Sequence, residues 1–508
     1  MVKLENGANM KRLVFCFDGT WNTINEKALT NVALTAAAVN NTGYALDKDG
    51  KPDKSKIVPQ IIHYDEGVGT NRLERLSGGA LGKGLYANVK EAYTFLCLNY
   101  EVGDEIYIFG FSRGAYTARS FAGLLGNCGI MKSQHIEKVI KAAALYKQRS
   151  ETEDETEKER LQKLMFGMHR QFGCEVTTCN AESDWKKSRV GLDDHNQDRI
   201  KISYLGLWDT VKSLIETKKS DREFHDDDIP ECASSGRHAL ALDEFRQTFN
   251  HTPWENIHDA NRRVWAENGS EGDFEDYKYS EMRAFKEVWF PGSHGSVGGG
   301  GDIRGLSDNA LLWVLDGAIQ QGLAIDTTPL SKIFQLAPTA LAELDNTTDD
   351  GFLENFAEFR HGFPKLGFVR SGPEHISEVS QSAIIRYACP PNFLPWEDDR
   401  DEDESYRPPA LTNNKKVHTK VKELSKDYTP EDYELYRGYH WEQNNYGTKN
   451  VSGVSYQPYR ITDEDTLGRI SKEQLGDPKK YKELQKCNKV MIPDANKVFT
   501  DQIINIPK

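Results

Sequence analysis

Short apolar runs alternate with stretches of helical spacing along the first part of the chain. Three runs predict buried strands, at 12–17, 57–64 and 104–111. The stretches between and after them predict helices, at 30–41, 85–100 and 115–125. Because strands that alternate with helices form parallel sheets, this order predicts an α/β protein with a parallel-rich central sheet flanked by helices.

The alternation breaks in two charged segments, 131–200 and 216–285. Both are polar with helical pieces, so we expect helical cap insertions there. Between and after them, the strand pattern resumes at 201–208 and 286–290, and a further helix is predicted at 306–323.

The end of the chain has a different character. An acidic run at 397–404 indicates a solvated loop, and the chain beyond residue 412 is rich in Lys, Asn and Tyr with little periodicity. We therefore expect one α/β domain over 11–411 and a polar C-terminal region over 412–508, to which no role is assigned.

Composition and charge narrow the classes of function. The 508 residues include 64 Lys and Arg against 78 Asp and Glu, which gives a net charge of -14 at pH 7. Nucleic acid is not expected as a partner, because proteins that bind phosphate backbones carry a basic face. No apolar run approaches eighteen residues, so no transmembrane helix is expected.

The lack of a recognisable secretory signal and the pattern of cysteines both predict an intracellular protein. The apolar run at 13–17 is too short for the hydrophobic part of a secretory signal. The eight cysteines are scattered and form no C-x-x-C motif, which is typical of reduced, intracellular proteins. A cytoplasmic location is expected, and export by a non-classical route stays open.

The strongest chemical motif is G-x-S-x-G at 110–114. It follows a β-rich run and precedes a helix rich in small residues, as a nucleophile elbow requires. The flanking glycines allow the close approach of strand and helix that such a turn needs. We interpret Ser112 as a nucleophile, and the alternative is an inert serine in a glycine-rich turn.

An elbow serine needs a base, and the base needs an orienting carboxylate. In proteins with this elbow the chain order is Ser, then Asp or Glu, then His. His294 is the candidate base, because it follows a strand-like run and lies in a Gly/Ser loop. Asp209 directly follows the run 202–208 and is the favoured acid. Asp302 is the rival acid, although it follows His294 in the chain.

An oxyanion hole needs two backbone N–H donors. We expect one from Arg113, the residue after the nucleophile, and one from Gly19 in the loop after the first strand. Asp18 and Asp302 are kept as accessory candidates. A phosphate-loop pattern at 78–83 lacks the required spacing, and the acidic stretch at 225–228 is better explained as an exposed loop than as a metal site, so no cofactor or metal is expected.

Five motifs occur in an order that is familiar from one protein family: FDGTWN at 17–22, GVGT at 67–70, GFSRGA at 110–115, WDTV at 208–211 and GSHGSVGGG at 292–300. Together they resemble the uncharacterised α/β-hydrolase domain family that includes the catalytic domain of bacterial type VI secretion phospholipase effectors. A weaker similarity covers 365–411. Where relatives carry HSDVGG, this chain has HGSVGG from His294 onward.

The resemblance implies a serine hydrolase with Ser112, Asp209 and His294 as its triad, and it suggests lipid esters as substrates. We therefore expect carboxylic ester hydrolysis by a phospholipase or lipase. The alternatives are a soluble acyl-esterase or thioesterase, and a non-catalytic binding protein on a hydrolase fold. The expected partners are a lipid or small acyl ester, transient contact with a membrane surface, and a secretion or immunity protein.

Overall fold

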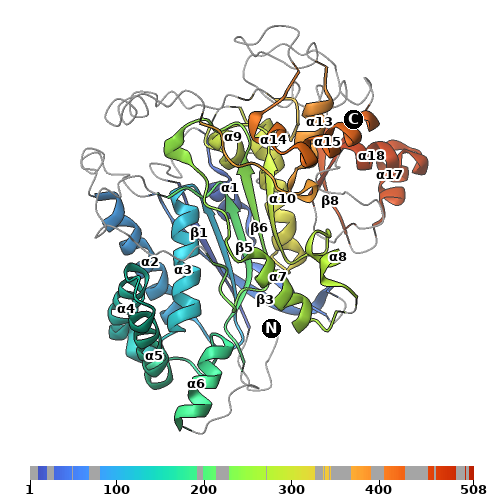
Figure 1. Ribbon diagram of the computed structural model, residues 1–508. Helices are drawn as coiled ribbons and strands as arrows, with labels where there is room; N and C mark the ends of the chain where they lie inside the picture. Colours follow the sequence, from blue (N-terminus) through green and yellow to red (C-terminus); the bar gives the residue numbers. More distant parts are fainter. Residues whose placement is uncertain are drawn as a thin grey trace.

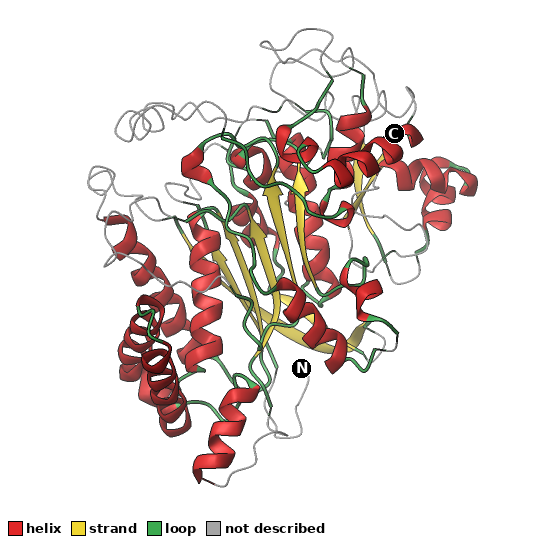
Figure 2. Ribbon diagram, in the orientation of Figure 1, coloured by secondary structure: helices red, strands yellow, loops and turns green. Residues whose placement is uncertain are grey.

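A seven-stranded sheet runs through the centre of the molecule (Figures 1 and 2). The computed structural model describes residues 10–19, 28–47, 50–67, 80–190, 198–212, 228–270, 272–301, 303–326, 336, 338–342, 344, 368–390, 405–428, 456–462, 465–487, 498 and 503–507. The sheet strands are β1 (Arg12–Phe17), β2 (Thr42–Leu46), β3 (Pro52–Asp65), β4 (Glu105–Phe111), β5 (Lys201–Trp208), β6 (Gly236–Ala241) and β7 (Phe285–Phe290).

The strand order is β2-β3-β1-β4-β5-β6-β7, and every neighbouring pair except β2 and β3 is parallel. The predicted parallel-rich sheet is therefore confirmed. The pattern missed β2 and the first residues of β3, because an antiparallel edge hairpin can be polar on both faces. The carboxyl ends of the parallel strands meet at one edge, which is where an α/β sheet places its functional residues.

Helices cover both faces of the sheet and pack around it: α1 (Asn31–Ala38), α2 (Ala80–Asn99), α3 (Arg113–Cys128), α4 (Val139–Glu151), α5 (Glu155–Phe172), α6 (Asn180–Val190), α7 (Ile257–Glu267), α8 (Phe274–Lys278), α9 (His294–Gly298), α10 (Gly305–Gln320), α13 (Gln381–Ala388), α14 (Pro409–Thr412), α15 (Lys415–Leu424), α17 (Leu467–Leu475) and α18 (Tyr481–Cys487). No helix in the part of the chain that the structure describes is both long and apolar enough to cross a membrane.

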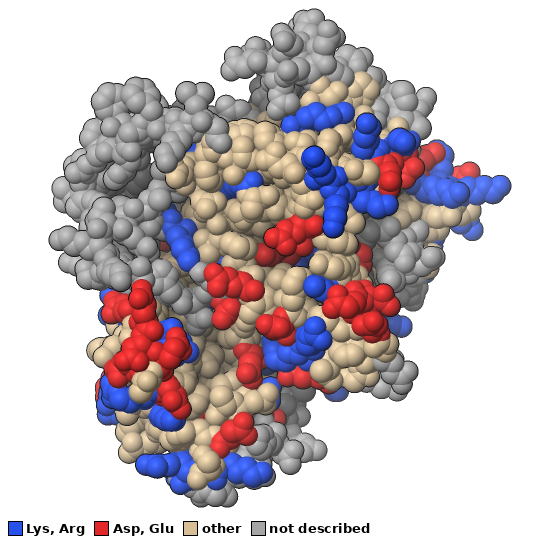
Figure 3. Space-filling model, in the orientation of Figure 1, with Lys and Arg blue, Asp and Glu red and all other residues tan. Residues whose placement is uncertain are grey.

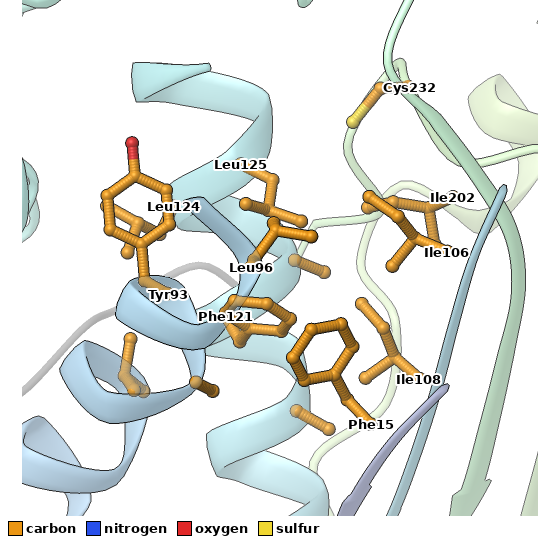
Figure 4. Packing of buried hydrophobic residues seen from close by; sticks show 14 of the residues in the cluster. Phe15, Tyr93, Leu96, Ile106, Ile108, Phe121, Leu124, Leu125, Ile202 and Cys232 are labelled. Atoms are coloured by element: carbon orange, nitrogen blue, oxygen red, sulfur yellow. The ribbon is translucent and has the colours of Figure 1, made fainter. Parts of the chain in front are cut away.

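The side chains of β1 show why the sheet is buried on both faces. Leu13 and Phe15 join a hydrophobic cluster with α2 and α3, whereas Val14 and Cys16 join a second cluster with α1 and α10. Figure 4 shows the first cluster, in which the rings of Phe15 and Phe121 lie 4.7 Å apart. A continuous apolar run, rather than strict alternation, follows from this double burial.

The segment 131–200 is helical, as expected, but its helices do not lie over the carboxyl ends of the strands. Val139, Tyr146 and Met165 pack into the same cluster as Tyr93 of α2 and Phe121 of α3. Figure 1 shows α4, α5 and α6 at the lower left beside these helices, whereas α9 lies at the top. The segment is a flanking helical addition to one layer rather than a cap.

The expectation of a second insertion at 216–285 was wrong in one respect. This segment contains β6, which lies between β5 and β7 inside the sheet. Arg237 and His238 interrupt its apolar pattern, and both are buried. Arg237 pairs with Asp316 at 2.8 Å, and His238 Nδ1 lies 2.8 Å from Glu287, so these polar groups are compensated inside the core.

The chain beyond residue 412 holds regular elements that its weak periodicity did not predict. Helix α15 packs beside α13, and β8 (Tyr456–Arg460) pairs with β9 (Ile503–Pro507) in a separate antiparallel sheet. Ile470 of α17 and Ile504 of β9 are buried in the cluster that contains Val14. These C-terminal elements therefore contribute to the hydrophobic core that covers one face of the main sheet.

Candidate active site

Ser112 stands at the sharp turn between β4 and α3. Its backbone has φ +58° and ψ -127°, and among the described non-glycine residues only Ser112 and Asp209 have positive φ. A Cβ atom at Gly110 would lie 2.6 Å from the Gly114 carbonyl oxygen. The glycines of the motif are therefore required by the close packing of strand, turn and helix, as in a nucleophile elbow.

The structure brings the three sequence-predicted side chains together. The Ser112 Oγ atom lies 2.8 Å from His294 Nε2, and His294 Nδ1 lies 2.6 Å from Asp209 Oδ2. These groups come from the ends of β4 and β5 and from the start of α9, and all three residues are buried. Residues 182 positions apart in the chain thus form one continuous hydrogen-bonded row.

His294 opens the short helix α9 rather than lying in an irregular loop. Its ring packs between two aromatic rings, 4.6 Å from Phe111 and 4.9 Å from Phe249 between centroids. The His294 backbone N–H donates to Glu244 Oε2 at 3.3 Å. Asn31 of α1 ties the end of α9 in place by donating to the Val297 carbonyl at 2.9 Å. The imidazole is therefore held in one orientation.

Asp209 accepts hydrogen bonds on both carboxylate oxygens. The Ala241 N–H donates to Oδ1 at 2.9 Å, and the guanidinium of Arg370 donates to Oδ1 at 2.6 Å and to Oδ2 at 2.9 Å. Sequence analysis missed Arg370, because no motif surrounds it and it lies 161 positions from its partner. Only the folded chain brings this cation to the acid.

The pKa values of this pair follow from burial and from their partners. Burial by itself would raise the pKa of Asp209, but the Arg370 cation and the His294 hydrogen bond outweigh it and hold the pKa well below its usual range. An ionised carboxylate can only accept hydrogen bonds, so His294 Nδ1 carries the proton. Burial lowers the pKa of His294, and the Asp209 carboxylate partly opposes that shift.

The loop after β1 lies directly beside the elbow. Asp18 is buried and accepts hydrogen bonds of 2.7 Å from Thr30 Oγ1, from the Tyr64 hydroxyl and from the Gly19 N–H. Burial, opposed by these three donors, raises the pKa of Asp18 to about 6. The Gly19 N–H, expected in an oxyanion hole, is thus bonded to the Asp18 carboxylate in this structure.

Arg113 follows Ser112 as the first residue of α3. Burial lowers the pKa of its guanidinium to about 10. The Arg113 backbone N–H lies in the first turn of α3, in the residue next to Ser112.

Several sequence candidates lie outside the described residues. These are the rival acid Asp302, the part of the FDGTWN motif at 20–22, the part of GVGT at 68–70, the acidic run 397–404 and residues 225–227 of the rejected metal stretch; the side chains at 78–83 also lie outside them. Within the described residues, no group of three or more His, Cys, Asp or Glu side chains is arranged to hold a metal ion.

Comparison with known proteins gives one family and a few relatives. Residues 11–317 match the family model described as T6SS, Phospholipase effector Tle1-like, catalytic domain. The uncharacterized protein YEL023C of Saccharomyces cerevisiae is 28% identical over 261 residues, which cover 48% of this chain and 33% of that protein. The chain therefore spans about a third of the length of this curated relative.

Two solved structures are similar to this chain at TM-scores of 0.31. The structure of the Tle1 effector bound to the VgrG spike from the Type 6 secretion system is 12% identical, with 71% of this chain and 81% of that chain covered. The crystal structure of an uncharacterized protein from Pseudomonas aeruginosa is 14% identical, with 97% and 78% covered.

The family model matches more than half of this chain, and the resemblance expected from the five ordered motifs is confirmed. The chain belongs to the family of Tle1-like type VI secretion phospholipase effectors, whose catalytic domain it carries.

Proposed function

We propose that this chain hydrolyses carboxylic esters through a Ser112–His294–Asp209 triad on an α/β-hydrolase fold. The observation that carries the proposal is the row of hydrogen bonds from the Ser112 hydroxyl through both ring nitrogens of His294 to Asp209, at 2.8 and 2.6 Å. The parallel sheet, the elbow after a central strand, and the chain order Ser, Asp, His support the fold assignment.

In the first half of the reaction, Ser112 Oγ attacks the acyl carbonyl carbon. His294 Nε2 takes the hydroxyl proton, and the carbonyl π electrons move to oxygen to give a tetrahedral oxyanion. When that intermediate collapses, the bond to the leaving alcohol breaks and the alcohol takes the proton from His294. The acyl group stays on Ser112 as an ester.

In the second half, water attacks the acyl-serine while His294 accepts its proton. Collapse returns the proton to Ser112 Oγ and releases the carboxylic acid. Asp209 keeps its negative charge throughout, orients the imidazole, and stabilises the imidazolium that forms twice in each cycle.

For the oxyanion we propose the Arg113 N–H as one donor and the Gly19 N–H as the other. Gly19 can serve only after its bond to Asp18 Oδ1 is exchanged for the substrate oxygen. Asp18 is then an accessory residue that holds the donor between turnovers. Asp302 keeps no role in this proposal, because Asp209 already contacts His294.

For the substrate class we propose phospholipids or related lipid esters, on the basis of the family to which the chain belongs. By analogy with the neighbour that is bound to the VgrG spike, we also propose a secretion-apparatus component as a protein partner.

A soluble acyl ester or thioester is the second candidate substrate. The net charge of -14 favours it, because anionic lipid surfaces attract basic patches. Figure 3 shows acidic side chains gathered at the left, over α4 and α5, and basic side chains at the upper right, near α17 and α18. Basic side chains also lie among the acidic ones over α4 and α5, so the two charges are interspersed on this face.

The test is hydrolysis of phospholipid vesicles by the purified wild type and Ser112→Ala, with the products identified by mass spectrometry and a soluble short-chain ester assayed in parallel. Ser120→Ala, which removes a buried hydroxyl two turns along α3, is the matched control. Release of fatty acid that depends on Ser112 alone would support a phospholipase. Turnover of only the soluble ester would favour the second candidate, and no labelling of Ser112 by a fluorophosphonate would favour a binding protein.

A further inference from the structure

We propose that Arg370 is a positioning residue of this site, which holds Asp209 in a fixed, charge-neutralised state and thereby keeps His294 neutral and able to accept a proton. The inference deepens the proposed function, since it assumes that His294 is the base. It adds a fourth side chain from a segment beyond the residues that the family model matches.

The geometry of the contact is that of a two-pronged ion pair. Arg370 Nη1 donates to Asp209 Oδ1 at 2.6 Å, and Nη2 donates to Oδ2 at 2.9 Å. The side chains of both residues are fully buried. Each carboxylate oxygen also accepts a second donor, Ala241 N–H on Oδ1 and His294 on Oδ2. With four directed bonds on two oxygens, the carboxylate cannot rotate away from the imidazole.

Arg370 is itself anchored independently of Asp209. Its Nη1 donates to the Ala241 carbonyl at 3.1 Å, and its Nη2 donates to the Phe249 carbonyl. Ala241 ends strand β6, and the ring of Phe249 packs against His294 at 4.9 Å. The guanidinium therefore links three parts of the site: the Asp209 carboxylate, the end of strand β6, and Phe249, whose ring packs against His294.

The charge balance gives Arg370 a second effect. A buried carboxylate without a partner strongly favours the protonated form of an adjacent imidazole, which cannot act as a base. With Arg370 present, the Asp209 pair is neutral overall, and Glu244 beside His294 is likewise paired with Arg246 at 2.8 Å. Removal of the Arg370 cation would leave one uncompensated negative charge next to the imidazole.

Other titratable groups face this cluster. Burial, reinforced by the Arg370 cation, lowers the pKa of His251 to about 4, so His251 is neutral at pH 7. Besides Arg370, the charged or titratable groups near His294 are Asp209, Glu244, Arg246 and His251. Glu287 and His238 act on His251 in turn.

The decisive measurement is the pKa of the His294 imidazole, followed by NMR in histidine-labelled protein and assigned with His294→Gln. Arg370→Met removes the charge and the N–H donors and keeps only an unbranched apolar stem, which reaches about as far as Nε of the arginine. We expect it to raise the His294 pKa by about one unit or more, and Arg370→Lys to leave it within roughly half a unit of wild type. Arg237→Met is the matched control, because it breaks another buried Arg–Asp pair at the opposite end of β6.

Activity on a soluble ester gives the second measurement. In Arg370→Met we expect kcat to fall by up to about 100-fold with little change in KM, and the acidic limb of the profile to move to higher pH. Arg370→Lys should keep the wild-type limb but lose part of kcat, since an ammonium cannot bind both oxygens as a fork. Arg237→Met should lower thermal stability without moving the limb.

The outcomes separate this inference from the proposed function. A His294 pKa that is unmoved in folded Arg370→Met, or raised equally in the Lys and Met variants, overturns the charge argument. If Arg370→Met does not fold, an unchanged kcat in Arg370→Lys overturns the positioning argument. A wild type that hydrolyses no ester refutes the proposed function, whereas the NMR titration still decides how Arg370 acts on His294.

Discussion

Gly114 lies directly against the backbone of Asp18. A Cβ atom added at Gly114 would stand 2.3 Å from the carbonyl oxygens of Asp18 and Phe17, and these backbone atoms cannot rotate away. Helix α3 can therefore approach the end of β1 only with glycine at this position. This contact places the turn at Ser112 beside the loop that carries Gly19.

The first prediction concerns this contact. Gly114→Ala should lower the free energy of unfolding by about 1–3 kcal/mol, because the backbone must shift to admit the methyl group, and it should abolish most ester turnover. Urea unfolding and hydrolysis of a soluble ester measure the two effects. Gly167→Ala in α5 is the control: its Cβ would meet only the end of Trp185 at 3.8 Å, so stability should hold or rise. Equal losses in both variants would contradict the argument.

A second prediction is the pH dependence of the reaction. The base must be neutral to accept the serine proton, so activity is present above the His294 pKa and disappears as the pH falls through it. Because burial lowers this pKa from its ordinary 6.5, the midpoint of the acidic limb in kcat/KM should lie below 6.5. A stopped-flow or plate-reader profile from pH 4.5 to 9 measures it. A midpoint clearly above 6.5 would show that the imidazole is not held in this neutral environment.

The third prediction concerns Glu182, a buried carboxylate outside the candidate active site, which should make the stability of the protein depend on pH. Glu182 is buried, lies 2.7 Å from His169 Nδ1 and 3.4 Å from Lys186, and accepts from Thr178. Burial opposes ionisation, but these partners outweigh it and lower the pKa of Glu182 from 4.5 to about 2. Its contribution to stability is therefore present above pH 4.5 and is lost as the pH falls toward 2.

Glu182→Gln should accordingly cost about 3 kcal/mol at pH 7, and the difference from wild type should narrow below pH 4.5. Urea unfolding at pH 7, 5 and 4 gives the trend. Glu159→Gln, which removes an exposed pair with Lys163, should leave the stability close to that of the wild type. A cost for Glu182→Gln that grows as the pH falls would have the wrong sign.

A fourth prediction tests whether the segment after residue 405 supports the site. The Tyr406 hydroxyl donates to Asp243 Oδ2 at 2.7 Å, and the same oxygen accepts the Gly292 N–H two residues before His294. Tyr406→Phe should cost about 1 kcal/mol of stability and lower kcat several-fold while KM changes little. Thermal unfolding and initial rates measure both. Tyr428→Phe, a buried tyrosine in the same hydrophobic cluster, serves as control for loss of a hydroxyl, and its rates should match wild type.

The amino-acid sequence by itself determined those features that depend on near neighbours in the chain. Five of the seven sheet strands, β1, β3, β4, β5 and β7, were predicted from their apolar runs, although β3 was predicted too short, and β2 and β6 were missed. Ser112 was a candidate nucleophile because glycines stand two residues before and after it, in the G-x-S-x-G pattern. Asp209 and His294 were identifiable because both follow apolar runs, and the structure places their side chains in one row with Ser112.

Only the tertiary structure decided which distant groups compensate one another. Strand β6 carries a buried arginine and histidine that local hydrophobicity counts against a strand, and their partners lie on α10 and β7. The helices at 131–200 are recognisable from their sequence, but the layer that they cover depends on α2 and α3. Arg370 lies in none of the five ordered motifs, and the weaker similarity over 365–411 did not single it out. Its role follows only from the fold, which brings this cation to Asp209 from 161 positions away as the counter-charge of a buried carboxylate.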